Sequence, residues 1–514
     1  MQLTISRKHK VVVVPPAPGV EAMFNGVPVL ADGNRIVPHG MRETMMLRHL
    51  GFTVPNPMDL HYDWSGGKKP FDVQRASCRM LTENPRAFLL NHMGTGKTKT
   101  ALWSWDYLNQ QGLVKKLLVV APLSTLNFVW LSEIFATLPG RRAVVLHGSR
   151  KQRLERLAQD ADIYIINHDG LKVIEKELHA RTDIDTLVLD ELAVYRNQSD
   201  RSKRMRVFAQ RFNTVWGMTG APMPNEPTDV WAQCQIIAPQ RVPKYRSHAR
   251  DILMMQLGPY LWKPKVNAIE TAFSWMQPSC RYSLEDVVEL PPLISRAVDV
   301  PLSEEQEDTY KRVATAMAVM VKKKQITALN AGAAMNKLLQ IAGGWVYTQR
   351  PEFVRLDPTP RIVAMADLIY ACDEKVLIAI PYRHMIDGIS KILNMKGVEI
   401  EHCCVHGDTP KREEFFNAFQ NTDKYKVMLV HPQCVSHGLT LTAASMIIWY
   451  SPTTSLDIYE QFNARITRVG QTKKQQILHL QGAAVEKKIY RMLHDHQRMQ
   501  NMFLELVEGA TVDA

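Results

Sequence analysis

The stretch Asn91-His92-Met93-Gly94-Thr95-Gly96-Lys97-Thr98 decides the fold of this chain. A short apolar run, 87–90, precedes it, and apolar residues follow it at the helical spacing of Ala101, Trp105 and Leu108. This pattern predicts a strand, a glycine loop and a helix in succession. Such a loop binds phosphate well, because its backbone N–H groups and the positive end of the helix dipole point at the same place.

The residue types in this loop suit a nucleoside triphosphate. Lys97 offers a positive charge to the outer phosphates, and Thr98 offers a hydroxyl to Mg²⁺. Glycine at positions 94 and 96 lets the backbone approach the phosphates without a Cβ atom in the way. Asn91 stands where the strict G-x-x-x-x-G-K-[ST] pattern has its first glycine. Taken alone, the stretch favours a nucleotide cradle over a turn that contains Gly-Lys-Thr by chance.

A glutamine lies upstream of the loop, at a distance that one helix could span. The amide of Gln74 both donates and accepts hydrogen bonds, so it can pair with the adenine edge and select ATP. A surface glutamine without a binding role is the alternative. The residues predicted to bind ATP are Gln74, Met93, Gly94, Thr95, Gly96, Lys97 and Thr98.

Length, charge and cysteine content narrow the class of protein. A chain of 514 residues suggests roughly two to four domains. Its 63 Lys+Arg against 51 Asp+Glu give a net charge of +12, which favours a polyanionic partner, although many basic proteins bind no nucleic acid. The seven cysteines form no C-x-x-C pair, so free thiols are expected rather than a zinc site. Pro15 and Pro16 interrupt the N-terminal apolar run, which argues against a signal peptide and predicts a soluble, cytoplasmic protein.

Apolar strands alternate with helical segments after the loop. The runs 117–120, 144–147 and 163–166 each end in polar residues, which predicts an α/β fold with a doubly wound parallel sheet. A further apolar strand ends in Asp190 and Glu191. Asp190 is placed to hold Mg²⁺, and Glu191 to deprotonate the attacking water. Acidic pairs at strand ends are common by chance, so this assignment depends on the phosphate loop that precedes it.

The remainder of the first half carries weaker signals. A basic segment, 201–211, predicts a helix that is either solvated or in contact with nucleic acid. The run 216–222 predicts a strand and a Thr-Gly-x-Pro turn that could sense the nucleotide. Residues 228–290 are expected to form a helical insertion, and Leu290-Pro291-Pro292-Leu293 a break between domains.

A second alternating block follows in the C-terminal half. Ser303 and Gln306 have the spacing of a helix capping box. Beyond them, four apolar runs predict another doubly wound domain, this time without a phosphate loop. The runs are 375–380, 403–407, 427–430 and 446–450.

One nucleotide site for two such domains implies a cleft that the second domain completes with positive charge. Gln461, Arg465 and Arg468 stand at i, i+4 and i+7, which is one face of a helix over 461–471. We predict that all three are catalytic and that the two arginines act as arginine fingers on the γ-phosphate. A basic amphipathic helix without this role is the alternative.

The order of these motifs resembles that of the superfamily-two helicases, and within them the SWI/SNF-like double-stranded DNA translocases. The resemblance covers about residues 70–500. The positions that carry it are Gln74, 91–98, Ala121-Pro122 with Ser124, Asp190-Glu191 with Asn197, 219–222 with Asn225 and Trp231, 290–292, 436–441 and 461–471. Ala193 replaces the histidine of the usual Asp-Glu-x-His box, which is expected to loosen coupling between hydrolysis and motion, and His437 replaces a usual glycine.

The resemblance implies two RecA-like doubly wound lobes with helical insertions and a small N-terminal module. The predicted domains are an accessory module at 1–66, lobe 1 at 67–290 with its insertion at about 228–290, and lobe 2 at 291–514 with an insertion at about 302–345. It further implies hydrolysis of ATP with Mg²⁺, coupled to movement on or remodelling of double-stranded or branched DNA in replication, recombination or repair.

The chain is similar to the short helicases of tailed bacteriophages, which would place it in the cytoplasm of a host cell. Two other functions stay open from the sequence. One is a strand-separating DNA or RNA helicase, and the other is a nucleotide-binding clamp on nucleic acid that does not turn over ATP.

Overall fold

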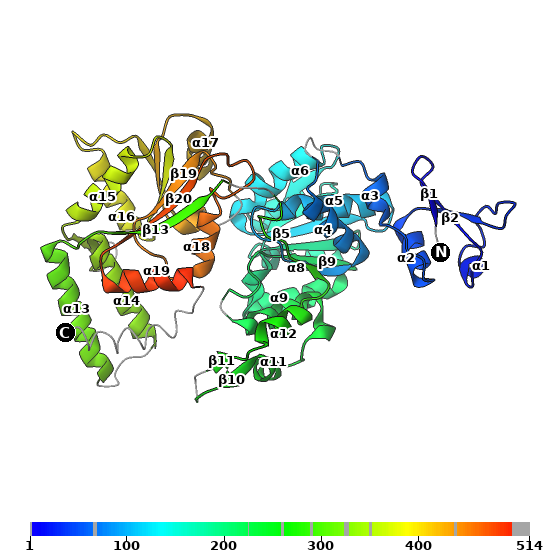
Figure 1. Ribbon diagram of the computed structural model, residues 1–514, viewed down its shortest axis with the longest axis horizontal. Helices are drawn as coiled ribbons and strands as arrows, with labels where there is room; N and C mark the ends of the chain where they lie inside the picture. Colours follow the sequence, from blue (N-terminus) through cyan, green and yellow to red (C-terminus); the bar gives the residue numbers. More distant parts are fainter. Residues whose placement is uncertain are drawn as a thin grey trace. The chain divides into compact units, whose positions relative to one another are not determined.

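The chain forms two compact units, Met1–Val287 and Val288–Ala514, in the computed structural model (Figure 1). The structure describes residues 3–64, 69–224, 226–258, 262–287, 291–322, 328–348, 352–435 and 439–495. Several positions with a predicted role fall outside these ranges, namely Asn225, Leu290, Ser436, His437 and Gly438. So does most of 65–70, a segment rich in glycine and lysine whose sequence predicts the linker into the first lobe. The finer domain boundaries at 66 and 290 stay predictions.

A seven-stranded sheet forms the centre of the first unit, and every pair of neighbouring strands in it is parallel. Its order is β12 (Ser279–Cys280), β4 (Arg86–Leu89), β9 (Thr214–Met218), β8 (Ile184–Asp190), β5 (Lys116–Ala121), β7 (Ile163–Asn167) and β6 (Ala143–Val145). Alternate residues of β5 enter separate core clusters, Leu117 in one and Leu118 in the other, because successive side chains point to opposite faces of a sheet. The predicted doubly wound sheet is therefore confirmed.

Helices connect these strands and supply the other half of each core cluster. They are α4 (Asp72–Glu83), α5 (Lys97–Gln110), α6 (Ser132–Thr137), α7 (Arg150–Leu157), α8 (Glu175–Ala180), α9 (Asp200–Phe208) and α10 (Val230–Ile237). All residues of α10 are buried, so this apolar helix packs inside the first unit.

The expected helical insertion at 228–290 is only partly helical. After α10 come α11 (Arg246–Leu253) and α12 (Ala268–Trp275), but β10 (Met254–Gln256) and β11 (Trp262–Pro264) pair as antiparallel strands between them. The Arg250 guanidinium lies 4.1 Å from the centre of the Trp262 ring, which ties this strand pair to α11. The segment then returns to the sheet as β12, whose two residues pair with β4.

The N-terminal residues form a separate antiparallel sheet with its own small core. Its strands are β1 (Thr4–Ser6), β2 (Val11–Val14) and β3 (Arg35–Pro38), and the helices α1 (Val20–Met23) and α2 (Met41–His49) accompany them. The core of this module runs from Val12 to Val54. The short helix α3 (Pro57–His61) follows and leads to α4.

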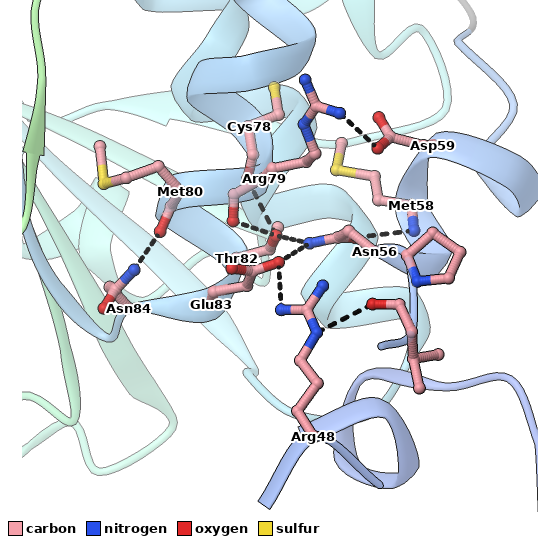
Figure 2. Close-up of polar contacts among 12 residues, drawn as sticks. Arg48, Asn56, Met58, Asp59, Cys78, Arg79, Met80, Thr82, Glu83 and Asn84 are labelled. Carbon is pink, nitrogen blue, oxygen red and sulfur yellow. Dashed lines mark hydrogen bonds and ion pairs between the residues drawn. The ribbon is translucent and has the colours of Figure 1, made fainter. Parts of the chain in front are cut away.

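Polar contacts join this module to the end of α4 (Figure 2). Arg48 forms an ion pair with Glu83 at 2.8 Å and donates from Nε to the carbonyl oxygen of Val54. The amide of Asn56 donates to Thr82 Oγ1 at 3.1 Å and to Glu83 at 2.9 Å. These partly buried bonds fix the module on the helix that begins near Gln74.

The second unit contains a six-stranded parallel sheet. Its order is β13 (Leu293–Asp299), β20 (Gln475–Gln481), β19 (Ala444–Trp449), β16 (Lys375–Ala379), β18 (Val427–Val430) and β17 (His402–Val405). The four strands predicted from apolar runs are confirmed. Two more, β13 and β20, were not predicted, because β13 is largely exposed and β20 begins and ends with glutamine.

Helices and one strand pair complete the second unit. The helices are α13 (Glu304–Lys322), α14 (Ala328–Gly343), α15 (Thr359–Tyr370), α16 (Arg383–Leu393), α17 (Arg412–Asn421), α18 (Leu456–Asn463) and α19 (Ala484–His494), and the pair is β14 (Trp345–Tyr347) with β15 (Phe353–Arg355). The predicted capping box is confirmed: Ser303 N donates to Gln306 Oε1, and Gln306 N donates to Ser303 Oγ. Within the described ranges, no helix combines the length and apolar character needed to cross a bilayer.

Candidate nucleotide-binding site

The phosphate loop has the backbone shape that its sequence requires. It follows β4, and α5 begins at Lys97. Gly94 and Gly96 have φ angles of 84° and 81°, a region that glycine enters without strain. Lys97 Nζ donates to the carbonyl oxygens of Asn91 at 2.8 Å and His92 at 3.1 Å, so the lysine spans the loop. The helix dipole and this ammonium group make the loop positive.

The structure brings Gln74 against the same loop. Gln74 lies in the first turn of α4, where its Oε1 accepts from the backbone N–H of Phe71 at 3.0 Å. Its Nε2 atom is 3.4 Å from the carbonyl oxygen of Gly96. A Cβ atom at position 96 would lie 2.1 Å from this Nε2 atom, so Gly96 is needed for space as well as for its φ angle.

Asn91, which stands at the first glycine position of the strict motif, has a structural role of its own. Its side chain is buried, donates from Nδ2 to Ser77 Oγ at 2.9 Å and accepts from the backbone N–H of Tyr282 at 3.1 Å. The residue thus connects α4, the loop and the segment that follows β12. In the sequence, Asn91 is recognisable only as a departure from the strict glycine motif. Its two hydrogen-bond partners, Ser77 and Tyr282, belong to no motif.

Asp190 and Glu191 lie at the carboxyl end of β8, as predicted. Trp130 Nε1 donates to Asp190 Oδ2 at 2.9 Å, and the backbone N–H of Glu191 donates to Asp190 Oδ1 at 3.1 Å. Burial raises the pKa of Asp190, while the bond from Trp130 and the charge of Lys97 oppose that rise. The charge of Lys97 therefore acts on this carboxyl group. The sequence pattern does not predict the bond from Trp130 to Asp190.

The Thr-Gly-Ala-Pro turn after β9 lies between the loop and the acidic pair. β9 is the strand between β4 and β8. Thr219 Oγ1 is 3.4 Å from Glu191 Oε1, and the backbone N–H of Thr219 donates to the carbonyl oxygen of Leu89. A Cβ atom at Gly220 would lie 3.3 Å from the backbone nitrogen of Met93. The turn therefore contacts both halves of the site.

Glu191 has a strained backbone at this point. Its φ of 55° and ψ of 55° lie in the left-handed region, which a glutamate enters at a cost of about 1–3 kcal/mol. The following 3₁₀ turn, Leu192–Tyr195, contains the buried Ala193 that replaces the usual histidine. This left-handed conformation turns the chain directly after Asp190. The two carboxylates therefore come from successive residues at the end of β8.

The second unit places Gln461, Arg465 and Arg468 differently from the sequence prediction. Helix α18 ends at Asn463, so only Gln461 is helical, and the two arginines follow in turns. Guanidinium groups bind carbonyl oxygens at and just beyond the end of this helix. Arg465 Nε donates to the oxygen of Gln461 at 2.6 Å, and Arg468 Nε to that of Ala464 at 3.1 Å. The prediction that all three residues share one helical face was therefore wrong.

Both guanidinium groups also contact the segment before β19. Arg465, which is 1% exposed, donates from Nη1 to the carbonyl oxygen of Leu439 at 3.0 Å. Arg468 donates from Nη1 to Thr440 Oγ1 at 3.1 Å. Burial lowers the pKa of Arg468 to about 10, so the group stays charged at neutral pH. The two arginines thus bring positive charge to the motif residues at 439–441.

The basic helix predicted at 201–211 is formed by α9, and acidic side chains pair with several of its cations. Arg201 lies 2.6 Å from Asp169, and Arg204 lies 2.9 Å from Glu175. Arg211 packs over the ring of Phe212 at 3.8 Å. These contacts favour the solvated helix among the two alternatives.

Two protein-family models match successive parts of the chain. The family model described as "SNF2-related domain" matches residues 73–345, and "Helicase conserved C-terminal domain" matches residues 361–470. The ISWI chromatin-remodeling complex ATPase CHR11 of Arabidopsis thaliana is 23% identical over 85% of this chain and 43% of its own length. Putative protein p41 of Acyrthosiphon pisum secondary endosymbiont phage 1 is 24% identical over 80% of this chain and 90% of its own length.

A similar solved structure is the SWI2/SNF2 ATPase core of Sulfolobus solfataricus in complex with dsDNA. It is 19% identical, the match covers 87% of this chain and 95% of that chain, and the TM-score is 0.41. This chain spans less than half the length of its ISWI relative. The SNF2-related model alone covers more than half of the 514 residues. The chain therefore belongs to the family of the SNF2-related domain.

Proposed function

We propose that this protein is a DNA-dependent ATPase that translocates on double-stranded or branched DNA and remodels what it meets there. The observation that carries the proposal is the meeting of Lys97, Asp190, Glu191 and Thr219 at the carboxyl ends of three neighbouring strands. Family membership supports ATP as the substrate. The net charge of +12 supports a polyanionic partner.

In this proposal, the residues of the first unit have separate roles in ATP binding and hydrolysis. Lys97 and the loop N–H groups bind the phosphates, and the Gln74 amide reads the adenine edge. Asp190 and Thr98 would hold Mg²⁺, which neutralises phosphate charge when bound; a carboxylate at a strand end and a hydroxyl at a helix start suit this oxygen-binding ion. Glu191 orients a water and takes its proton. Thr219, within 3.4 Å of Glu191, couples that carboxylate to the turn after β9.

Arg465 and Arg468 of the second unit supply the remaining positive charge in this proposal. Two guanidinium groups at the γ-phosphate would stabilise the transition state and favour turnover by about 10³–10⁵-fold. Each cycle of ATP binding and hydrolysis would then change the relation between the two units and move the protein along the DNA backbone. The phage relative p41 supports an action in the cytoplasm of a host cell.

Phosphate release with different nucleic acids tests this function. The assay compares duplex DNA, branched DNA, single-stranded DNA and RNA for the unaltered protein, Lys97→Ala and Glu191→Gln. We expect duplex or branched DNA to stimulate the unaltered protein most. Lys97→Ala should lose nucleotide binding, whereas Glu191→Gln should bind nucleotide and DNA but lose at least about 10²-fold in turnover.

Lys115→Ala is the matched control, because Lys115 is exposed and its ordered contact to Asp185 is made by the backbone N–H. Stimulation by RNA or single strands alone would indicate a strand-separating helicase instead. Turnover at the unaltered rate in Glu191→Gln would refute the assignment of the base.

A further inference from the structure

The segment between α10 and β12 concentrates positive charge. Residues 239–270 contain six Lys and Arg against two carboxylates, Asp251 and Glu270. In Figure 1, α11, β10 and β11 lie beyond α9 and α12, away from the strands of the sheet. The charge is therefore carried by a part of the first unit that does not form the candidate nucleotide site. We call its six cations the basic surface: Arg241, Lys244, Arg246, Arg250, Lys263 and Lys265.

Contacts within this segment bring the cations of different elements together. Arg246 and Arg250 stand at i and i+4, on one face of α11. The Arg250 guanidinium lies 4.1 Å from the centre of the Trp262 ring at the start of β11. Lys265 Nζ donates to the carbonyl oxygen of Asp251 at 2.6 Å. The helix and the strand pair thus present their charge together.

Acidic side chains leave most of this charge uncompensated. Arg246 approaches Glu226 at 3.9 Å, and no other cation of the basic surface forms an ion pair with the described residues. Arg241, Lys244 and Lys263 are exposed to solvent. Cations that lie close together without counterions repel one another, so the surface favours a polyanionic ligand.

An exposed aromatic ring lies among these cations. Tyr245 is 57% exposed, although it directly precedes α11. Lys244 Nζ lies 5.5 Å from the centre of its ring, and the His248 ring packs against it edge to face. An unpaired base can stack on such a ring, whereas the bases of a duplex are already stacked on one another. An exposed ring beside cations is typical of surfaces that bind single strands.

A polar hollow adjoins the basic surface. Trp231 Nε1 donates to the carbonyl oxygen of Pro243 at 2.7 Å, and Gln235 Nε2 donates to the same oxygen at 3.1 Å. Since Pro243 precedes Lys244, the hollow lies next to the start of the basic surface. Its volume is about 180 Å³, and its lining residues are Gln198, Ser202, Lys203, Arg206, Trp231, Ala232 and Gln235.

The lining of the hollow is positive and contains no carboxylate. Lys203 lies 3.7 Å from Asp200, whose side chain is 94% exposed. Arg206 forms no ion pair with the described residues, in contrast to Arg201 and Arg204 of the same helix. A phosphate group can therefore take the place of a counterion here.

Two glutamine side chains give the hollow unused hydrogen-bonding capacity. The Gln198 amide is exposed and bonds to no described residue, and Gln235 uses only its Nε2 atom in the bond to Pro243. An amide donates and accepts at once, as the edge of an unpaired base requires. The volume is below the roughly 300 Å³ of a small-molecule site, so it suits one base or phosphate of a strand better than a free nucleotide.

We propose that the basic surface and the hollow bind an unpaired strand of branched DNA. The cations contact its phosphates, one base stacks on Tyr245, and a neighbouring base or phosphate enters the hollow beside Gln198. The proposal deepens the proposed function and rests on it, because it gives the protein a means to prefer branched DNA to continuous duplex. A duplex or an acidic protein would use the cations alone.

Equilibrium binding to the full chain without ATP tests the proposal. A forked duplex with unpaired thymidine arms and a blunt duplex of the same paired length are titrated by fluorescence anisotropy at several salt concentrations. The double variant Arg206→Gln/Lys244→Gln alters the hollow and the basic surface. The matched control is Lys391→Gln/Lys396→Gln, which removes the same charge from exposed lysines of the second unit. Thermal unfolding confirms that each variant is folded.

We expect the double variant to bind the fork at least about fivefold more weakly at low salt, with a slope of log affinity against log salt that falls by about 0.7 for each lost contact. The blunt duplex should bind as it does to the unaltered protein. The Lys391/Lys396 control should bind both DNAs like the unaltered protein.

Two substitutions at Tyr245 separate stacking from charge. Tyr245→Leu removes the ring and should weaken binding of the fork by about fivefold or more. Tyr245→Phe keeps the ring and should bind the fork like the unaltered protein. Neither change alters the net charge, so the salt slope should be retained in both. Equal affinity of the two variants for the fork would refute stacking on this ring.

Unchanged binding of the fork by a folded double variant would overturn the proposal, as expected if the surface binds an acidic protein instead. So would an equal loss for the blunt duplex, which would indicate a duplex track, or an equal loss in the Lys391/Lys396 control, which would indicate an effect of net charge. The proposed function fails separately: if DNA does not stimulate phosphate release by the unaltered protein, binding of the fork still reports on this surface.

Discussion

Trp130 is a positioning residue for Asp190, at the scale of a single hydrogen bond. The indole N–H fixes one carboxylate oxygen at 2.9 Å, and the backbone N–H of Glu191 fixes the other at 3.1 Å. In the proposed function, Asp190 is therefore oriented before Mg²⁺ binds. A partner that orients a metal ligand commonly contributes 10–100-fold to metal affinity or activity.

We predict that Trp130→Phe raises the Mg²⁺ concentration for half-maximal ATP hydrolysis by about 10-fold or more. The reason is that phenylalanine fills most of the indole volume but cannot donate to Asp190. A magnesium titration of phosphate release measures the effect. The control is Trp105→Phe, because the buried indole nitrogen of Trp105 makes no hydrogen bond to the described residues. An equal Mg²⁺ requirement in the two variants would contradict the role of Trp130.

Residue-scale features differ in how well the sequence predicts them. Lys97, Asp190 and Glu191 were predictable because a glycine loop or a strand end fixes their position in the chain. The bonds of Trp130 to Asp190 and of Asn91 to Ser77 join residues that are 60 and 14 positions apart. Such contacts depend on how helices pack beside the sheet, which no local pattern specifies.

The two arginines after α18 illustrate the scale of an element. Their guanidinium groups bind carbonyl oxygens at the end of the helix, at 2.6 Å for Arg465 and 3.1 Å for Arg468. A periodic pattern of charge predicts a helical face, but it does not report that the charged side chains bind carbonyl oxygens near the end of a shorter helix. A guanidinium group has five N–H donors, so in the proposed function each arginine can bind a phosphate oxygen and keep a bond to the chain.

We predict that Arg468→Ala lowers DNA-stimulated ATP turnover by about 10³-fold and leaves nucleotide affinity within about threefold. The charge acts on the transition state more than on bound ATP. Steady-state phosphate release and binding of a fluorescent ATP analogue measure the two quantities. Arg491→Ala, an exposed arginine of α19, should retain full turnover. Loss of nucleotide binding together with turnover would instead indicate that Arg468 stabilises the fold.

Strand β20 contains a histidine whose protonation opposes folding. His479 is 1% exposed and lies 2.9 Å from the Tyr459 hydroxyl oxygen. Burial lowers its pKa from 6.5 to about 4. Below pH 6.5 the unfolded chain takes up a proton that the folded unit refuses until about pH 4. The stability from neutral His479 is therefore complete above pH 6.5 and is lost as the pH falls towards 4.

We predict that His479→Gln flattens the pH dependence of stability by up to about 3 kcal/mol between pH 6.5 and pH 4. The variant has no group at this position that titrates in that range. Urea unfolding at a series of pH values measures the free energy of unfolding. His248→Gln, at an exposed position of α11, should retain the slope of the unaltered protein. Parallel pH profiles for both variants would show that His479 is not responsible.

Elements with a continuous apolar sequence were predictable, and those without one were not. The runs that became β16 and β18 are almost wholly buried, as a central parallel strand must be. The edge strand β13 is exposed along most of its length, so its sequence carries no continuous apolar run. The strand pair β10–β11 and the two-residue β12 are too short for a periodic signal.

At the scale of the whole molecule, the core of the first unit extends into the segment before α4. Met58 is completely buried and Tyr62 is 7% exposed, and both belong to the core cluster that contains Leu89 and Trp105. The separate core of the N-terminal module ends at Val54. Met58 and Tyr62, which come before the predicted boundary at residue 66, therefore pack in the sheet core of the first unit.

We predict that removal of residues 1–66 lowers the Tm of the first unit by roughly 5 °C or more relative to removal of residues 1–54. Only the longer truncation deletes Met58 and Tyr62 from the core. Differential scanning calorimetry of both truncated proteins measures the difference. Equal Tm values would show that 55–66 contribute no stability to this unit.

Helix α4 connects the N-terminal module to the candidate nucleotide site. Gln74 touches the phosphate loop near one end of α4, and Thr82 and Glu83 hold the module near the other. Thermodynamic linkage makes any communication along this helix reciprocal. If a ligand at the module changes the affinity for ATP by some factor, ATP must change the affinity for that ligand by the same factor.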